Sequence, residues 1–181
     1  MKVIGFTGMP FSGKTEAVKI ARESGFPVIR MGEVIWEEVT SRGLALTDEN
    51  VGSVADSMRQ ECGKGIWAQR TVDKIKSMGE TDCVVIDGIR NVEEIDVFKQ
   101  ELSEDFVVVA VDASVDTRRK RALLRGREDD SGDLSDVEER DRREVRWGMG
   151  TVMASADIVV SNEGSIDEFR DKIRETLDAL S

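Results

Sequence analysis

One short stretch near the N-terminus constrains the fold more than any other part of this sequence. Residues 8–15 read Gly-Met-Pro-Phe-Ser-Gly-Lys-Thr, the G-x-x-x-x-G-K-T pattern of a phosphate-binding loop. Residues 2–7 before it predict a buried strand, and residues 16–23 after it predict a helix. Strand, glycine-rich turn and helix in this order direct backbone N–H groups and a helix N-terminus at one anion. The sequence therefore predicts a phosphate site here.

Every residue of this loop is a candidate ligand-binding position. The Lys14 side chain is expected to reach the outer phosphates, and the Thr15 hydroxyl is expected to hold Mg²⁺. A bulky residue in such a loop is tolerated only if its backbone stays in an ordinary conformational region, which is our expectation for Phe11. The candidate binding residues are Gly8, Met9, Pro10, Phe11, Ser12, Gly13, Lys14 and Thr15.

Composition narrows the class of protein. The chain has 181 residues with 39% hydrophobic and 35% charged residues, which fits one soluble globular domain. The net charge of −11 argues against a general nucleic-acid binder. No apolar run is long enough to span a bilayer and no signal-peptide pattern is visible, so we expect a cytoplasmic protein. Cys62 and Cys83 have no metal-binding spacing and are expected to be reduced and buried.

Strands alternate with helices along the whole chain, which predicts an α/β fold with a parallel sheet. Further strands are predicted at 27–31, 83–87, 106–111 and 157–161. Residues 32–80 are mostly helical and exceed what a simple crossover needs, which indicates an acceptor-binding region. A helical hairpin that only packs on the sheet explains them equally well. Caps are predicted at Thr47, Asn91 and Ser165, the last in a capping box with Glu168.

The third predicted strand ends in Asp87, followed by Gly88 and Arg90. In phosphate-loop enzymes an Asp at this place holds Mg²⁺ directly or through water. Arg90 is expected at the mouth of the sheet, where ligands of open α/β sheets bind. The simpler alternative is a surface arginine that caps a turn. The chain has no His and no Tyr, so a general acid or base must be Asp, Glu, Lys or Cys.

Arginine is concentrated between residues 116 and 146, which contain nine of the seventeen arginines and equal numbers of acidic and basic residues. Two arginine-bearing helices joined by a polar, glycine-containing loop indicate a lid over residues 118–147 that closes on phosphates. A solvated helix pair with i,i+4 ion pairs is the alternative.

Several motifs together resemble those of dephospho-CoA kinase and the adenylate-kinase-like nucleoside monophosphate kinases. The combination also resembles a group of archaeal kinase-like proteins near that enzyme. The motifs keep the family's order and cover almost the whole chain as a single domain of 181 residues. They are GMPFSGKT at 8–15, RMGEV at 30–34, VVIDGIRN at 84–91, RALLRGREDD at 121–130 and ADIVVSNEGSIDEF at 156–169.

The resemblance implies the phosphate-loop (P-loop) NTPase fold, with a five-stranded parallel sheet flanked by helices, and it implies ATP and Mg²⁺. Asp87 would serve the metal or the acceptor, and Arg90 would bind acceptor phosphate. Asn162 and Gly164, in the turn before the last helix, would lie against adenine. Glu33 stands where these kinases carry an Asp, and either Glu33 or Asp87 would be a base for a hydroxyl acceptor. The lid candidates are Arg121, Arg125, Arg127, Arg140 and Arg143.

The sequence therefore predicts an ATP- and Mg²⁺-dependent kinase. Its acceptor would be a small nucleotide-like molecule, either dephospho-CoA-like or a nucleoside monophosphate. The alternative is a P-loop ATPase or nucleotide-binding switch that acts on a protein or RNA partner. The sequence does not determine the acceptor, the preference for ATP or GTP, or the oligomeric state.

Overall fold

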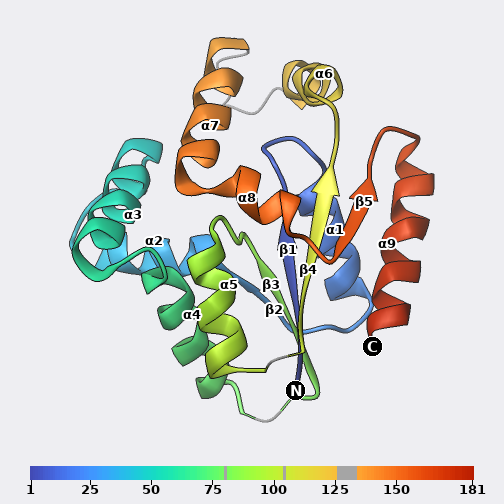
Figure 1. Cartoon of the computed structure of the whole chain (residues 1–181). Helices are drawn as coiled ribbons and strands as arrows, with labels where there is room; N and C mark the ends of the chain where they lie inside the picture. Colours follow the sequence, from blue (N-terminus) through green and yellow to red (C-terminus); the bar gives the residue numbers. More distant parts are fainter. Residues whose placement is uncertain (80, 104, 126–133) are drawn as a thin grey trace.

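The sheet of this protein is five-stranded and parallel throughout, as predicted (Figure 1). The computed structural model describes residues 1–79, 81–103, 105–125 and 134–181. The strand order across the sheet is β2-β3-β1-β4-β5. The strands are β1 (Lys2–Thr7), β2 (Val28–Arg30), β3 (Cys83–Asp87), β4 (Phe106–Asp112) and β5 (Ile158–Ser161).

Helices cover both faces of the sheet, and α6 and α7 stand over the edge to which the strand arrows point (Figure 1). Residues 126–133, which include the lid candidate Arg127, lie outside the described residues. The helices are α1 (Lys14–Glu23), α2 (Met31–Ser41), α3 (Asp48–Cys62), α4 (Ile66–Ser77), α5 (Val92–Glu101), α6 (Val115–Arg125), α7 (Leu134–Trp147), α8 (Met149–Ala154) and α9 (Ile166–Leu180).

The strands are apolar on both faces because each face is buried under helices. Alternate residues of β1 point to opposite sides, so Val3 belongs to one core cluster and Ile4 and Phe6 belong to the other. The cluster of Val3 includes side chains from α2 to α5, whereas the cluster of Ile4 and Phe6 includes side chains from α1 and α9. Two cores on one central strand fix the position of the loop that follows β1.

Side-chain caps begin three of the helices where the sequence predicts them. Thr47 accepts a hydrogen bond from the backbone N–H of Asn50, and Asn91 accepts one from the N–H of Glu94. Ser165 and Glu168 form the predicted capping box at the start of α9. These caps are worth about 1 kcal/mol each and define where the helices enter.

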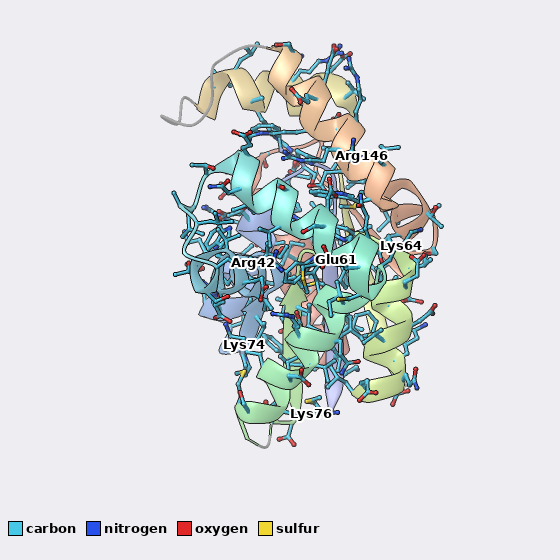
Figure 2. All side chains as sticks on the ribbon, turned by 90° about the vertical axis from the view of Figure 1, so that its left-hand side faces the viewer. Arg42, Glu61, Lys64, Lys74, Lys76 and Arg146 are labelled. Atoms are coloured by element: carbon cyan, nitrogen blue, oxygen red, sulfur yellow. The ribbon has the colours of Figure 1, made fainter. Side chains whose placement is uncertain are left out.

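The predicted helical region between the second and third strands contains α2, α3 and α4. Figure 2 shows their outer surface, where charged side chains such as Lys74 and Lys76 point away from the protein. Lys74 pairs with Glu37 at 2.5 Å and Lys76 pairs with Glu101 at 2.8 Å. This outer surface therefore carries exposed ion pairs, and the acceptor-binding role predicted for residues 32–80 stays a prediction.

No helix in the described part of the chain combines the length and the apolar character needed to cross a membrane. The prediction for the cysteines was half wrong, because Cys62 is exposed at the end of α3 while Cys83 is partly buried in β3. Both are free thiols. The last turn of α3 therefore faces solvent at Cys62.

Candidate functional site: a pocket at the carboxyl edge of the sheet

The loop between β1 and α1 requires glycine at two positions. Gly13 has φ 107°, in the left-handed region, and a Cβ added there would lie 2.1 Å from Asn162 Nδ2. A Cβ added at Gly8 would lie 2.6 Å from the carbonyl oxygen of Val111. Both glycines therefore let the loop lie against the ends of the neighbouring segments while α1 begins directly at Lys14.

Three side chains from distant segments hold the outer surface of this loop. Arg118 donates to Pro10 O at 3.2 Å, Arg121 donates to Ser12 O at 3.1 Å, and Asn162 donates to the same oxygen at 2.8 Å. We call Arg118, Arg121 and Asn162 the loop brace. Their donors bind loop carbonyl oxygens and so hold the shape of the loop, within which the Ser12 N–H also donates to Met9 O at 3.1 Å.

The brace changes how two predicted residues are understood. Arg121, a lid candidate, uses its second nitrogen to bind Asn162 O at 2.7 Å, so it ties α6 to the end of β5. Asn162 is buried behind the loop and does not line the pocket, and neither does Gly164. Their predicted contact with adenine stays a prediction.

Arg118 was missed by the sequence reasoning. Its side chain is only 5% exposed and forms a two-bonded pair with Asp141, with both distances 2.8 Å. This pair joins α6 to α7, and Arg118 joins both to the loop. A run of four basic residues, 118–121, gave no sign of which member turns inward.

Lys14, Asp87 and Arg30 form a charged triad at the carboxyl edge of the sheet. Lys14 Nζ forms a hydrogen-bonded ion pair with Asp87 Oδ1. Arg30 Nε lies 3.4 Å from Asp87 Oδ2, and β2 and β3 place these two residues side by side in register. Asp87 was a predicted site residue and the structure brings it to Lys14, whereas Arg30 was not among the predicted site residues.

The residues near Lys14 fit a Mg²⁺ ion held mainly by phosphate oxygens and water. Thr15 is exposed beside the loop, and the carboxylate of Asp87 lies on the other side of Lys14. No cluster of three His, Cys, Asp or Glu that could hold a metal occurs within the described ranges. Mg²⁺ needs no such cluster, because in nucleotide sites one or two protein oxygens and the phosphates suffice.

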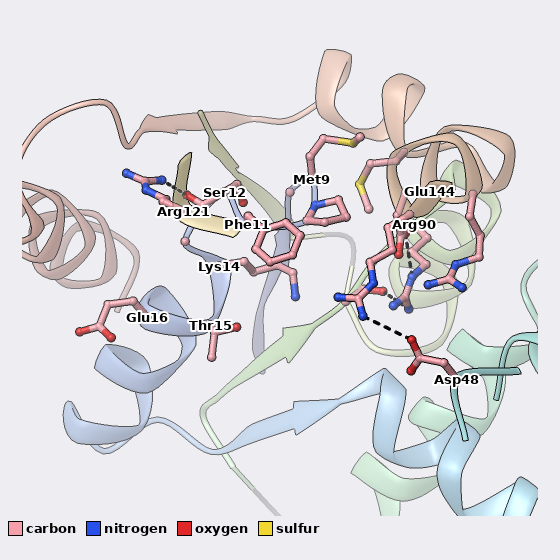
Figure 3. Close-up of a pocket in the computed structure, with 17 residues that line it drawn as sticks. Met9, Phe11, Ser12, Lys14, Thr15, Glu16, Asp48, Arg90, Arg121 and Glu144 are labelled. Carbon is pink, nitrogen blue, oxygen red and sulfur yellow. Dashed lines mark hydrogen bonds and ion pairs between the residues drawn. The ribbon is translucent and has the colours of Figure 1, made fainter. Parts of the chain in front are cut away.

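Phe11 contradicts the expectation for its backbone. Its φ is 64°, and it is the only non-glycine residue with positive φ in the described part of the chain. The left-handed region costs an ordinary residue about 1–2 kcal/mol. The expectation failed because the fold of the loop sets this torsion, which the residue type does not control. The ring points into the pocket beside Lys14 (Figure 3).

Opposite the loop, Arg90 contacts several partners. Its Nε donates to Glu144 of α7 at 3.0 Å, its Nη1 donates to Gly88 O at 3.2 Å, and its backbone N–H donates to Glu94. Burial opposes the charge of Arg90, but Glu144 and Glu94 outweigh it, and the net effect raises the pKa of the guanidinium.. Arg90 is therefore a cation held in place at the pocket wall. Its position agrees with the one predicted for it, at the mouth of the sheet.

Three guanidinium groups surround the indole of Trp147. Arg59, Arg90 and Arg143 lie 4.8, 5.3 and 5.5 Å from its ring centre. The Trp147 Nε1 donates to Asp56 of α3 at 2.5 Å. This cluster joins α3, α7 and the turn after β3, and it places Arg90 and Arg143 on one wall.

Arg59 and Glu94 form a buried pair behind this wall. Their atoms lie 3.4 Å apart, and Glu94 is fully buried. Burial raises the pKa of the Glu94 carboxyl and lowers the pKa of Arg59. Nε and Nη1 of Arg59 are buried without a hydrogen-bond partner among the described residues, so this pair is only partly satisfied.

A pocket of about 600 Å³ separates these two walls (Figure 3). Five cationic side chains and three carboxylates line it, in a protein whose net charge is −11. This excess of cations favours an anionic ligand. The lining residues are Gly8, Met9, Pro10, Phe11, Ser12, Gly13, Lys14, Thr15, Glu16, Asp48, Gly88, Arg90, Arg121, Arg140, Arg143, Glu144 and Met149.

The pocket brings together most of the predicted site residues. Arg140 and Arg143 of α7 enter it from the side facing α3, where Arg140 lies 3.5 Å from Asp48. Glu33 lies in the first turn of α2 and is not among the lining residues. Arg127 falls outside the described residues, and of Arg125 only the backbone is described.

The comparisons with known proteins agree with this architecture. Residues 7–138 match the family described as AAA domain. A UPF0200/UPF0201 protein of Archaeoglobus fulgidus is 45% identical and covers 98% of this chain, which spans 55% of that protein. A UPF0200 protein of Methanosarcina mazei is 40% identical, and the match covers 98% of this chain and 94% of the relative.

Two solved structures share the fold at low sequence identity. TT1252 from Thermus thermophilus superposes with a TM-score of 0.68 at 18% identity, covering 99% of this chain and 98% of the other. A gluconokinase from Sinorhizobium meliloti 1021 gives 0.62 at 15% identity, covering 99% and 93%. At such identities the likeness is one of fold, and that fold is the one found in P-loop kinases.

Proposed function

This chain belongs to the UPF0200 proteins and contains the AAA domain, and from that premise we propose that it is an ATP-dependent phosphotransferase. The enzyme would move the γ-phosphoryl group of ATP to a small anionic acceptor. One observation carries the proposal: Lys14 of the phosphate loop and Arg90 and Arg143 of the opposite wall line one pocket. A donor bound to one wall and an acceptor bound to the other would have their reacting groups in the same pocket.

The donor half of the pocket is suited to a triphosphate. The loop N–H groups and Lys14 would bind the outer phosphates, as in other phosphate-loop proteins. The buried hydroxyl of Ser12 has no hydrogen-bond partner in the described structure and is available to a ligand. Thr15 and Asp87 would hold Mg²⁺, which supplies charge neutralisation at the transferring phosphoryl group.

The acceptor half supports a nucleotide-like molecule, dephospho-CoA-like or a nucleoside monophosphate. Arg90 and Arg143 are fixed against Trp147, which suits a phosphate on the acceptor. A phosphate acceptor needs positioning and charge neutralisation, whereas a hydroxyl acceptor also benefits from a carboxylate base. Neither carboxylate is among the lining residues, but Asp87 is ion-paired with Lys14, so Asp87 is the better candidate for that base.

The test is a transfer assay with labelled ATP and Mg²⁺. The acceptors are nucleoside monophosphates, dephospho-CoA and small hydroxy acids, and mass spectrometry identifies the product. We expect acceptor-dependent ADP release with a phosphorylated product. ATP hydrolysis that ignores every small acceptor but rises with a protein or RNA would favour the ATPase or switch instead.

Lys14→Ala should lower the transfer rate by about three orders of magnitude, a loss of about 4 kcal/mol of transition-state stabilisation. Lys19→Ala is the matched control, because Lys19 is an exposed lysine of the same helix, 3.6 Å from Glu23. Circular dichroism checks that both variants are folded. If Lys14→Ala keeps wild-type transfer, the phosphate loop is not the donor site.

A further inference from the structure

Phe11 is the residue of the phosphate loop that its phosphate-binding role does not explain. Its backbone adopts a left-handed conformation that glycine would adopt without cost. Non-glycine residues in this region cluster at functional sites, where the surrounding structure holds them in place. A phenylalanine here keeps a backbone penalty that a single substitution would remove, so its side chain is the feature to explain.

The ring lies in the part of the pocket where transfer would occur. Phe11 is half-buried and lines the pocket together with Lys14, three residues later in the loop. In Figure 3 both side chains point into the space that Arg90 faces from the other wall. Every other lining group around this space is backbone, polar or charged, apart from Met9, Pro10 and Met149. The ring is therefore a large apolar surface beside the cation that would hold the outer phosphates.

We infer that Phe11 is a specificity-determining residue whose ring keeps water away from the γ-phosphoryl group and so favours transfer over hydrolysis. The inference rests on the proposed kinase function. In hydrolysis, a water oxygen forms a bond to the γ-phosphorus as the bond to the β–γ bridging oxygen breaks. The protons of that water end on phosphate and in solvent. An apolar ring offers water no hydrogen bond at this place, whereas a bound acceptor brings its own contacts with the opposite wall.

Two substitutions of Phe11 separate the effect of the ring from the effect of the backbone strain. Phe11→Gly removes the ring and releases the strain, whereas Phe11→Ala removes the ring and keeps a Cβ at positive φ. Both variants should raise the rate of ATP hydrolysis without acceptor by about tenfold, which corresponds to an activation free energy lower by about 1.4 kcal/mol. Phe11→Leu keeps apolar bulk and should give a several-fold smaller rise than Phe11→Ala. Met78→Ala, an exposed apolar residue at the end of α4, is the control.

The experiment measures phosphate release from ATP and Mg²⁺ by the full chain, together with the affinity for a non-hydrolysable ATP analogue. The affinity should change less than about threefold, because the loop N–H groups remain. Hydrolysis at the wild-type rate in both Phe11→Gly and Phe11→Ala would overturn the inference. So would a rise in Phe11→Gly alone, which would assign the effect to backbone strain. If the wild type does not bind the ATP analogue, the proposed function fails. That result differs from the two outcomes above, which concern only the hydrolysis rates of the Phe11 variants.

Discussion

The two walls of the pocket are built in different ways. On the proposed donor side, buried Arg118 and Asn162 and half-buried Arg121 donate to loop carbonyl oxygens at 2.8–3.2 Å and connect α6, α7 and β5 to the loop. On the acceptor side, α3 and α7 meet through exposed pairs at 3.5 Å, Arg140 with Asp48 and Arg146 with Asp56. Behind these exposed pairs lie the Trp147 cluster and the more buried pairs of Arg90 with Glu144 and Arg59 with Glu94.

This difference fits what each wall would do in the proposed kinase. A triphosphate is bound by several N–H groups at once, so the loop must already have its final shape. An acceptor has to enter and leave, and exposed ion pairs contribute little to stability and break easily. We therefore expect substitutions in the loop brace to lower the free energy of unfolding more than substitutions in the exposed pairs.

The largest effect is expected at Arg118. Arg118→Ala leaves Asp141 without its two-bonded partner and should lower the free energy of unfolding by about 3–5 kcal/mol, measured by urea denaturation. Arg119→Ala is the matched control. Arg119 is the next residue and pairs with Glu138 at 2.9 Å on the surface, so its loss should lower the free energy of unfolding by less than about 1 kcal/mol. Similar losses in the two variants would contradict a braced donor wall.

A smaller effect is expected at Asn162. Asn162→Ala removes the buried bond to Ser12 O and should cost about 1–3 kcal/mol, together with weaker binding of an ATP analogue. Asn50→Ala removes a comparable amide bond, 2.9 Å to Ala45 O, on the exposed acceptor side. It should cost about 0.5–1 kcal/mol in the same urea titration. Equal costs would mean that the two walls are equally rigid.

The smallest effect is expected at Asp48. Asp48→Asn weakens the pair with Arg140, and because Asp48 is 74% exposed the stability should change by less than about 1 kcal/mol. The KM for the acceptor should change more than the affinity for the ATP analogue, since Arg140 lines the pocket. A stability loss above about 2 kcal/mol would show that this wall is not loosely held.

The sequence predicted those features that depend on neighbours in the chain. The loop, the carboxylate at the end of β3, the capping residues and Arg90 all belong to short patterns with a local physical cause. The contacts of Arg118 with Asp141, Arg90 with Glu144 and Arg59 with Glu94 join residues far apart in sequence, and no spacing rule selects them. The conformation of Phe11 was mispredicted for a related reason, because the closure of the loop and not its residue type sets φ.

The triad of Lys14, Asp87 and Arg30 has a consequence for ligand selection. Lys14 is already ion-paired with Asp87. A small anion such as inorganic phosphate would have to displace this carboxylate from Lys14, so its net binding free energy would be small. In the proposed kinase, a metal-bound triphosphate would give Lys14 a phosphate partner and would give Asp87 the metal. Arg30, 3.4 Å from Asp87, would stay beside the carboxylate during this exchange. The ion pair between Lys14 and Asp87 would therefore favour binding of the complete metal–nucleotide complex over binding of phosphate alone.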